Sequence, residues 1–269
     1  MPRACVFCNS TTSKISGEHV IPEWVAGLFP EEEQMTYGIV QGDGSLKDFQ
    51  ARPFQQTVNV VCKPCNTGWM SRLEGAVNPK LGPMIQSARV TRLTPRTQKL
   101  LATWAVKTAL MLEHLHPAPR IIPESEYPRL YAEQQPPRGY LVFLSRWSPE
   151  IDARRKALVV SRTSRVNEFS VRSDATEEEI RETRKRADLF FSGTYTLFQV
   201  MFAIGHAAFA VIGHNAPMTL GFNVGPGLQN VAQRIWPREH SVTWPPKTAL
   251  GGAGLLGDFF ASREQDPPT

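Results

Sequence analysis

Four cysteines in two Cys-x-x-Cys pairs are the feature that most constrains how this 269-residue chain can fold. The pairs are Cys5 with Cys8 and Cys62 with Cys65, and the chain has no other cysteine. A two-residue spacer lets each pair grip one tetrahedral ion from a tight turn, and four thiolate ligands leave no open position for water. The sequence therefore predicts a structural zinc site that fastens the N-terminus to a distant segment.

A redox role is the alternative for the cysteine pairs. A thioredoxin-like pair opens a helix within a βαβ unit, whereas this chain has two pairs and no such pattern. The chain opens Met1-Pro2-Arg3 without the apolar core of a signal peptide, which predicts a cytoplasmic protein. Thiols stay reduced in that compartment, so metal binding is favoured over disulfides.

The charge balance leans mildly toward an anionic partner. The chain has 30 Lys and Arg against 25 Asp and Glu, a net charge of +5, and 41% hydrophobic residues, as soluble globular proteins do. The most apolar run, residues 197–213, is interrupted by Gln199, Gly205 and His206. It predicts two buried strands and no membrane span.

The pattern of helices and strands predicts an α+β protein with a first domain at residues 1–83 and a second at 84–269. In the first, strands at 37–40 and 46–49 flank a Gly- and Asp-containing turn and form an inserted hairpin. A strand at 56–61 then leads to the second cysteine pair. The helix that follows, residues 66–76, is expected to end at Asn78-Pro79.

The second domain is expected to mix helices with antiparallel strands. Thr94 and Pro95 suit the N-cap and first position of a core helix that runs to about His116. A polar helix should start at Thr176, where Thr176 and Glu179 fit a capping box. Further strands are expected at residues 139–146, 157–162 and 168–172, and they resume at Tyr195.

Three residues around the cysteine pairs carry a possible chemistry. Glu18 and His19 lie between the pairs, and Asn66 directly follows Cys65. In this order the sequence resembles the HNH (ββα-metal, His-Me finger) endonucleases, most closely the endonuclease VII-like branch with a four-cysteine zinc site. The resemblance covers residues 5–76. It implies a zinc-stapled ββα-metal nuclease module that cuts DNA.

The resemblance also implies a role for each residue. His19 would deprotonate the attacking water, and Glu18 with Asn66 would hold a catalytic Mg²⁺ or Mn²⁺. The family has a further Asn ahead of the second cysteine pair that orients the base, and Asn59 is the nearest candidate. Adjacent residues on a regular strand point to opposite sides, so Glu18 and His19 can both serve the site only where the strand ends. Pro22 is consistent with such an end.

Several features outside this constellation stay open. Glu74, two helical turns after Asn66, is expected to be a solvated helix carboxylate. Arg89, Arg92, Arg96 and Lys99 form a basic run that is either a phosphate-contacting surface or a solvated face. The second domain is expected to recognise substrate or a partner, and a dimer is one possible assembly. The competing function is a zinc-binding module that grips nucleic acid or protein without cutting.

Overall fold

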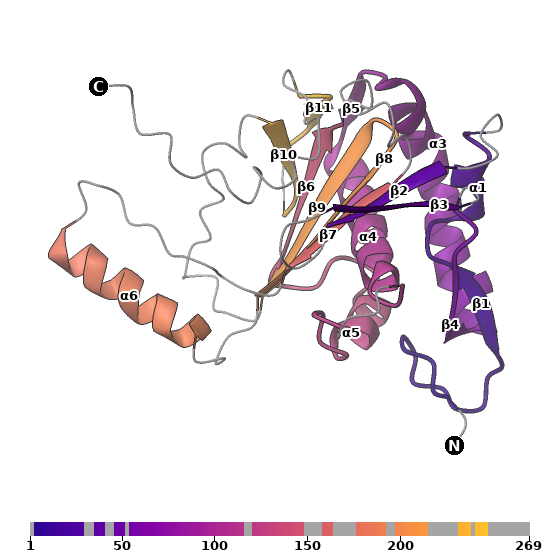
Figure 1. Cartoon of the computed structure of the whole chain (residues 1–269), viewed down its shortest axis with the longest axis horizontal. Helices are drawn as coiled ribbons and strands as arrows, with labels where there is room; N and C mark the ends of the chain where they lie inside the picture. The colour runs from indigo at the N-terminus through magenta and orange to yellow at the C-terminus, as the bar shows by residue number, and fades with distance from the viewer. Residues whose placement is uncertain are drawn as a thin grey trace.

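Helix α4 (Pro95–Leu112) is the central element of the fold. The computed structural model describes residues 3–29, 35–40, 46–51, 54–115, 120–147, 158–163, 176–191, 197–214, 231–237 and 240–246. Within these ranges, α4 lies between α3 (Ser71–Ser87) on one side and a seven-stranded sheet on the other (Figure 1). A helix enclosed in this way must be apolar around its whole circumference.

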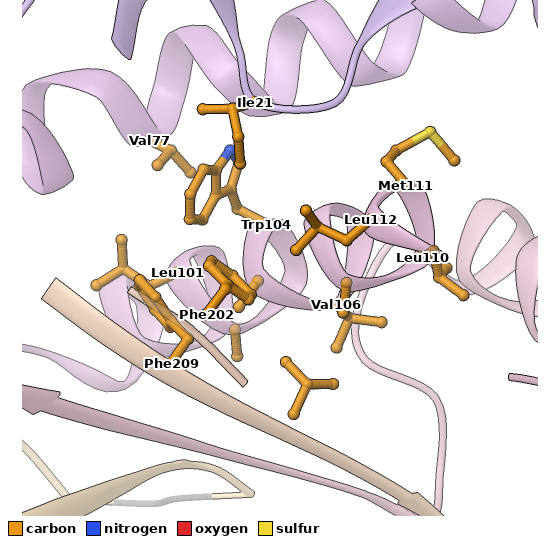
Figure 2. Packing of buried hydrophobic residues seen from close by; sticks show 14 of the residues in the cluster. Ile21, Val77, Leu101, Trp104, Val106, Leu110, Met111, Leu112, Phe202 and Phe209 are labelled. Carbon is orange, nitrogen blue, oxygen red and sulfur yellow. The ribbon is translucent and has the colours of Figure 1, made fainter. Parts of the chain in front are cut away.

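From Leu101 to Leu112 the sequence of α4 meets that requirement except at Thr103, Lys107 and Thr108. Every residue from Leu101 to Leu112 is buried. The Thr94 hydroxyl accepts a hydrogen bond from the Thr97 amide at 3.3 Å, and Pro95 takes the first helical position, so the predicted start is confirmed. In Figure 2, Trp104 of α4 lies between Ile21 and Val77 on one side and Phe202 and Phe209 on the other.

The seven-stranded sheet is antiparallel at every neighbouring pair except one. Its strands, in spatial order, are β10 (Ala232–Trp236), β6 (Tyr140–Arg146), β9 (Ala207–His214), β8 (Leu197–Ile204), β7 (Leu158–Thr163), β2 (Met35–Val40) and β3 (Leu46–Ala51). Only β2 and β7 run parallel. Strands β8 and β9 confirm two buried strands in the apolar run, and no helix within the described ranges has the length and apolar content to cross a membrane.

The inserted hairpin is confirmed as β2 and β3, although its turn, residues 41–45, lies outside the described residues. Through β7 the hairpin joins the sheet formed by the second half of the chain. One buried apolar cluster also runs from Cys5 to Trp244. The first eighty-three residues therefore share both a sheet and a core with the rest. The strand expected at residues 168–172 lies outside the described part of the chain.

The N-terminal region pairs two strands and follows them with a long helix. Strand β1 (Ile15–His19) runs antiparallel to β4 (Thr57–Cys62), and the short helix α1 (Glu23–Ala26) follows β1. After β4, the chain passes through α2 (Lys63–Cys65) and a wide turn, η1 (Asn66–Met70), into α3.

The expected end of this helix at Asn78-Pro79 is wrong, because α3 continues through Pro79 and Pro83 to Ser87. Each internal proline costs about 3 kcal/mol in an isolated helix. Here Val77, Leu81, Met84 and Ile85 are buried on α3. Burial of such side chains contributes about 1.5–3 kcal/mol each, which offsets the two prolines.

The remaining elements complete the edges of the fold. They are α5 (Glu126–Glu133), α6 (Glu177–Phe191), β5 (Thr91–Leu93) and β11 (Val242–Trp244), the last two forming a separate two-stranded sheet. The capping box of α6 is confirmed, because Thr176 and Glu179 bond each other's backbone amides. Helix α4 ends at Leu112, whereas the sequence predicted an end at about His116.

His114 gives the fold a testable pH dependence. Burial lowers the pKa of its ring to about 4, helped by the nearby Arg120 charge, and the ring packs against Tyr127. A depressed pKa means that the neutral ring stabilises the fold above pH 6.5 and that this contribution is lost as pH falls toward 4. The free energy of unfolding should therefore decline more steeply over this interval in the wild type than in a His114→Phe variant, measured by urea denaturation. Parallel declines would contradict this origin.

Candidate functional site

The four cysteines converge on one point, as their spacing predicts. The Sγ atoms of Cys5, Cys8, Cys62 and Cys65 all lie within 4.8 Å of one another, and Cys8 Sγ is 3.6 Å from Cys62 Sγ. Four sulfurs placed tetrahedrally about 2.3 Å from zinc are separated by about 3.8 Å, far more than the roughly 2.0 Å of a disulfide. All four cysteines are free, and the cluster could hold a metal ion such as zinc.

The surroundings of the cluster favour the thiolate at Cys5 and oppose it at Cys65. Burial acts to raise the pKa of Cys5, but hydrogen bonds from the backbone amides of Cys8, Cys62 and Phe7 outweigh it and lower the pKa to about 7. Burial and the neighbouring thiols raise the pKa of Cys65. Four adjacent thiolates repel one another, so a divalent cation is the partner that would stabilise all of them together.

Aromatic side chains enclose the cluster and connect it to α5. The Phe7 ring, between the first two cysteines, meets Trp69 edge-on at 5.1 Å and contacts Tyr127 of α5 at 5.8 Å. Trp69 in turn meets Tyr131 of α5 at 6.0 Å. The cysteine cluster is therefore packed against a helix from the second half of the chain.

Asn66 directly follows Cys65 and reaches β1 from the start of a wide turn. In the wide turn η1, Gly68 leaves the helical conformation, with φ −94° and ψ −106°. Such wide turns often occur at functional sites. The Asn66 Nδ2 donates to the Gly17 carbonyl at 3.0 Å and to the Ser16 hydroxyl at 3.3 Å. Both bonds use the nitrogen, and among the described residues the Asn66 side-chain oxygen accepts no hydrogen bond.

Gly17 of β1 lies opposite a bulge in β4 that contains Asn59. Ser16 is opposite Val61 and Glu18 is opposite Val58, so Asn59 and Val60 together face Gly17. A β-carbon on Gly17 would lie 3.8 Å from the Asn59 Oδ1. An extra residue of this kind re-aims side chains locally, so Asn59 reaches the strand that carries His19 despite its closeness to Cys62.

His19 shares a face of the strand pair with these polar groups. It is the last residue of β1, two residues after Gly17, and pairs with Thr57. Side chains alternate along a strand, which puts Gly17 and His19 on one face and Glu18 on the other. Thr57 and Asn59 are exposed and His19 is half-buried. We call Gly17, His19, Thr57 and Asn59, together with Asn66, whose amide bonds the Gly17 backbone carbonyl, the open-face cluster.

Glu18 lies on the opposite, buried face in an ion triad. The Lys107 Nζ, from the middle of α4, is 2.8 Å from the Glu18 Oε1 and 2.7 Å from the Glu74 Oε1 of α3. The Lys107 side chain is fully buried and those of Glu18 and Glu74 are 6% and 20% exposed. Burial raises the pKa of Glu18 against the attraction of Lys107, while the two carboxylates hold Lys107 charged by raising its pKa.

The triad gives two glutamates partners that the sequence did not suggest. Glu74 is not a solvated helix carboxylate, because it binds Lys107. Glu18 was expected to reach a metal ion beside Asn66, whereas its carboxylate binds the ammonium and Asn66 binds the backbone of β1. The available signal was Lys107 itself, the only charged residue between Leu100 and Leu112. A charge in such a run needs a buried counter-charge.

Comparison of the chain with protein-family models, with curated proteins and with solved structures finds no match. The geometry described above therefore carries the functional argument.

Lys107 should be the most sensitive charged position in this region. Removing one partner of a buried ion pair leaves an unpaired charge and costs about 3–5 kcal/mol. Lys107→Met should lower the free energy of unfolding by about that amount, measured by urea denaturation, and Lys107→Met combined with Glu18→Gln and Glu74→Gln should recover part of it. Lys99→Met, on the exposed part of the same helix, is the matched control. Equal stability of the two single variants would contradict the triad's role.

Proposed function

We propose that the N-terminal region is a zinc-stapled nuclease module of the HNH type, which hydrolyses phosphodiester bonds in DNA. The observation that carries the proposal is the open-face cluster, in which the Asn66 amide bonds to Gly17 and His19 follows two residues later on the same face. The pairing of β1 with β4 and the helix α3 that follows β4 support this proposal. The cysteine cluster lies at the junction of strand and helix.

In this proposal the cysteine cluster holds zinc and has a structural role. Four protein ligands would fill the coordination sphere, so the ion has no open position for substrate. Its contribution is to hold the start of the chain against the β4–α2 junction, which fixes Asn66 next to β1. The chemistry then belongs to the open-face cluster.

Zinc content offers the first test. The purified protein should contain about one zinc per chain by elemental analysis, and Cys62→Ser should lose it together with a large part of the folding free energy, because structural zinc sites contribute directly to folding. Ser10→Ala, two residues after Cys8 and outside the four-cysteine cluster, is the control. Zinc retained at the wild-type level by the Cys62→Ser protein would contradict the assignment.

His19 would act as the general base. A neutral imidazole within reach of a water molecule can take a proton from it. The water oxygen then attacks phosphorus, the proton passes to a His19 ring nitrogen, and the bond to the 3′ oxygen breaks. Among the described residues no side chain bonds the His19 ring, which leaves its nitrogens to water and substrate.

A divalent ion fits this face only in part. Mg²⁺ and Mn²⁺ prefer oxygen ligands, and the Asn66 carbonyl oxygen is such a donor, with Asn59 close to the same strand. An ion bound there would stabilise the negative charge that develops on the phosphate. The Glu18 carboxylate does not fit as a second ligand while Lys107 holds it on the buried face. We therefore place Asn66, and not Glu18, at the ion.

A second function follows from the same ion pair. Glu18 is the only carboxylate among the three residues of the HNH resemblance, Glu18, His19 and Asn66. Because it binds Lys107 on the buried face, it does not contribute a carboxylate to the open-face cluster. A zinc-stapled module that binds nucleic acid without cutting it would need none. The two functions share the zinc site and differ at His19.

A cleavage assay distinguishes these two functions. Supercoiled plasmid and single-stranded and branched DNA should be cut in Mg²⁺ or Mn²⁺, and His19→Ala should reduce the rate by about 10²–10⁴-fold, the usual contribution of a general base. His240→Ala, at an exposed histidine far along the chain, is the matched control. The same residual cutting by wild type and His19→Ala would reject the nuclease and leave the binding module.

A further inference from the structure

A long stretch of the chain without an acidic residue, residues 75–112, begins shortly after Asn66. Between Glu74 and Glu113 there is no Asp or Glu, while this stretch has six cations. They are Lys80, Arg89, Arg92, Arg96, Lys99 and Lys107. The stretch thus has a net charge of +6, the rest of the chain has a net charge of −1, and the whole chain has a net charge of +5. The positive charge of the whole protein is concentrated here.

The structure separates one of these cations from the others. Lys107 is buried and neutralised by Glu18 and Glu74. The other five are exposed, and within the part of the chain that the structure describes none of them lies in ion-pair contact with a carboxylate. We call these five residues, with the exposed Arg72 of α3, the basic strip.

The basic strip follows two helices and the strand between them. Arg72 and Lys80 are eight residues apart on α3, which places them on the same side of the helix. Arg92 lies on β5, paired with Thr243 of β11, and Arg96 and Lys99 occupy the first turns of α4. The strip therefore begins one and a half helical turns after Asn66 and continues past the end of α3 to β5 and the start of α4, elements whose arrangement Figure 1 shows.

The backbone under the strip is fixed. The buried Gln98 Nε2 donates to the Leu93 carbonyl at 2.8 Å and to the His240 carbonyl at 2.7 Å, which ties β5 to the start of α4 and to the chain before β11. Between Arg72 and Lys80, α3 exposes only small or ring-closed side chains, Gly75, Ala76 and Pro79. A partner can therefore approach this helix closely.

Like charges on a rigid surface repel one another and destabilise the fold slightly unless a partner of opposite charge binds. A phosphodiester backbone presents closely and regularly spaced negative charges, and exposed Lys and Arg bind it by displacing its counterions. We propose that the basic strip is the surface along which a nucleic acid backbone lies, over α3 and β5 to the start of α4. The inference rests on the proposed function for its choice of nucleic acid.

Binding measured without cleavage tests the strip. Fluorescence anisotropy of a labelled 30-bp duplex, in EDTA-free buffer without Mg²⁺ and at several salt concentrations, gives the slope of log K against log salt. The strip variant is Arg89→Gln/Arg92→Gln/Arg96→Gln. The control, Arg138→Gln/Arg184→Gln/Lys185→Gln, removes three exposed cations elsewhere and has the same net charge.

The strip variant should bind at least about tenfold more weakly near 0.15 M salt, with the salt slope reduced by about 2 to 3, since each phosphate contact contributes about 0.9. The control variant should stay close to the wild type. Equal losses in the two variants would overturn the strip, and so would strip-dependent binding to phosphatidylserine vesicles without binding to DNA.

A second measurement uses the wild-type protein and does not depend on a variant folding. Acetylation of Lys80 and Lys99, followed by mass spectrometry, should slow when the duplex is added, whereas acetylation of Lys185 should not. Uniform rates would also overturn the strip. Strip-dependent binding together with absent cleavage would reject only the nuclease, and cleavage that is lost in His19→Ala but unaffected by the strip variant would reject only this surface.

Discussion

The Lys107 ammonium lies where water cannot reach it, and its charge is acceptable there only because two carboxylates from different elements meet it. Glu18 comes from β1, Glu74 from α3, and Lys107 from the helix that also supports the seven-stranded sheet. Breaking either contact would leave a charge buried without a partner, which is far more costly than losing a surface pair. The triad therefore fixes the relative position of three elements, and both the open-face cluster and the cysteine cluster depend on that position.

The parts of the fold that depend on local chemistry could be predicted from the sequence. Two-residue cysteine spacing indicates a shared ion, and the Thr94-Pro95 start and the Thr176 capping box each satisfy backbone groups within one turn. The alternation and interruptions of residues 197–213 indicate paired strands. None of these inferences requires knowledge of what lies across the core.

The parts that depend on tertiary contacts could not be predicted. Pro79 and Pro83 end a helix only if nothing offsets their cost, and the burial of α3 against α4 offsets it. The sequence did not show which face of β1 carries Glu18. Alternation of side chains along the strand separates Glu18 from His19 but does not indicate which of the two faces is buried. Lys107 decides that question from 89 positions away, 107 minus 18, and no local pattern connects the two. Asn59 reached β1 through a bulge that sequence spacing does not reveal.

The hairpin of β2 and β3 has a consequence for the order of folding. It is inserted between β1 and β4, yet its sheet partner β7 lies more than a hundred residues further along the chain. The loop that a metal at the cysteine cluster closes thus contains one edge of the distant sheet. Closing that loop early would reduce the conformational freedom of the segment that contains β2 before β2 pairs with β7, because a closed loop has fewer conformations than an open chain. Metal availability during synthesis would then influence how fast a sheet without any metal ligand is completed.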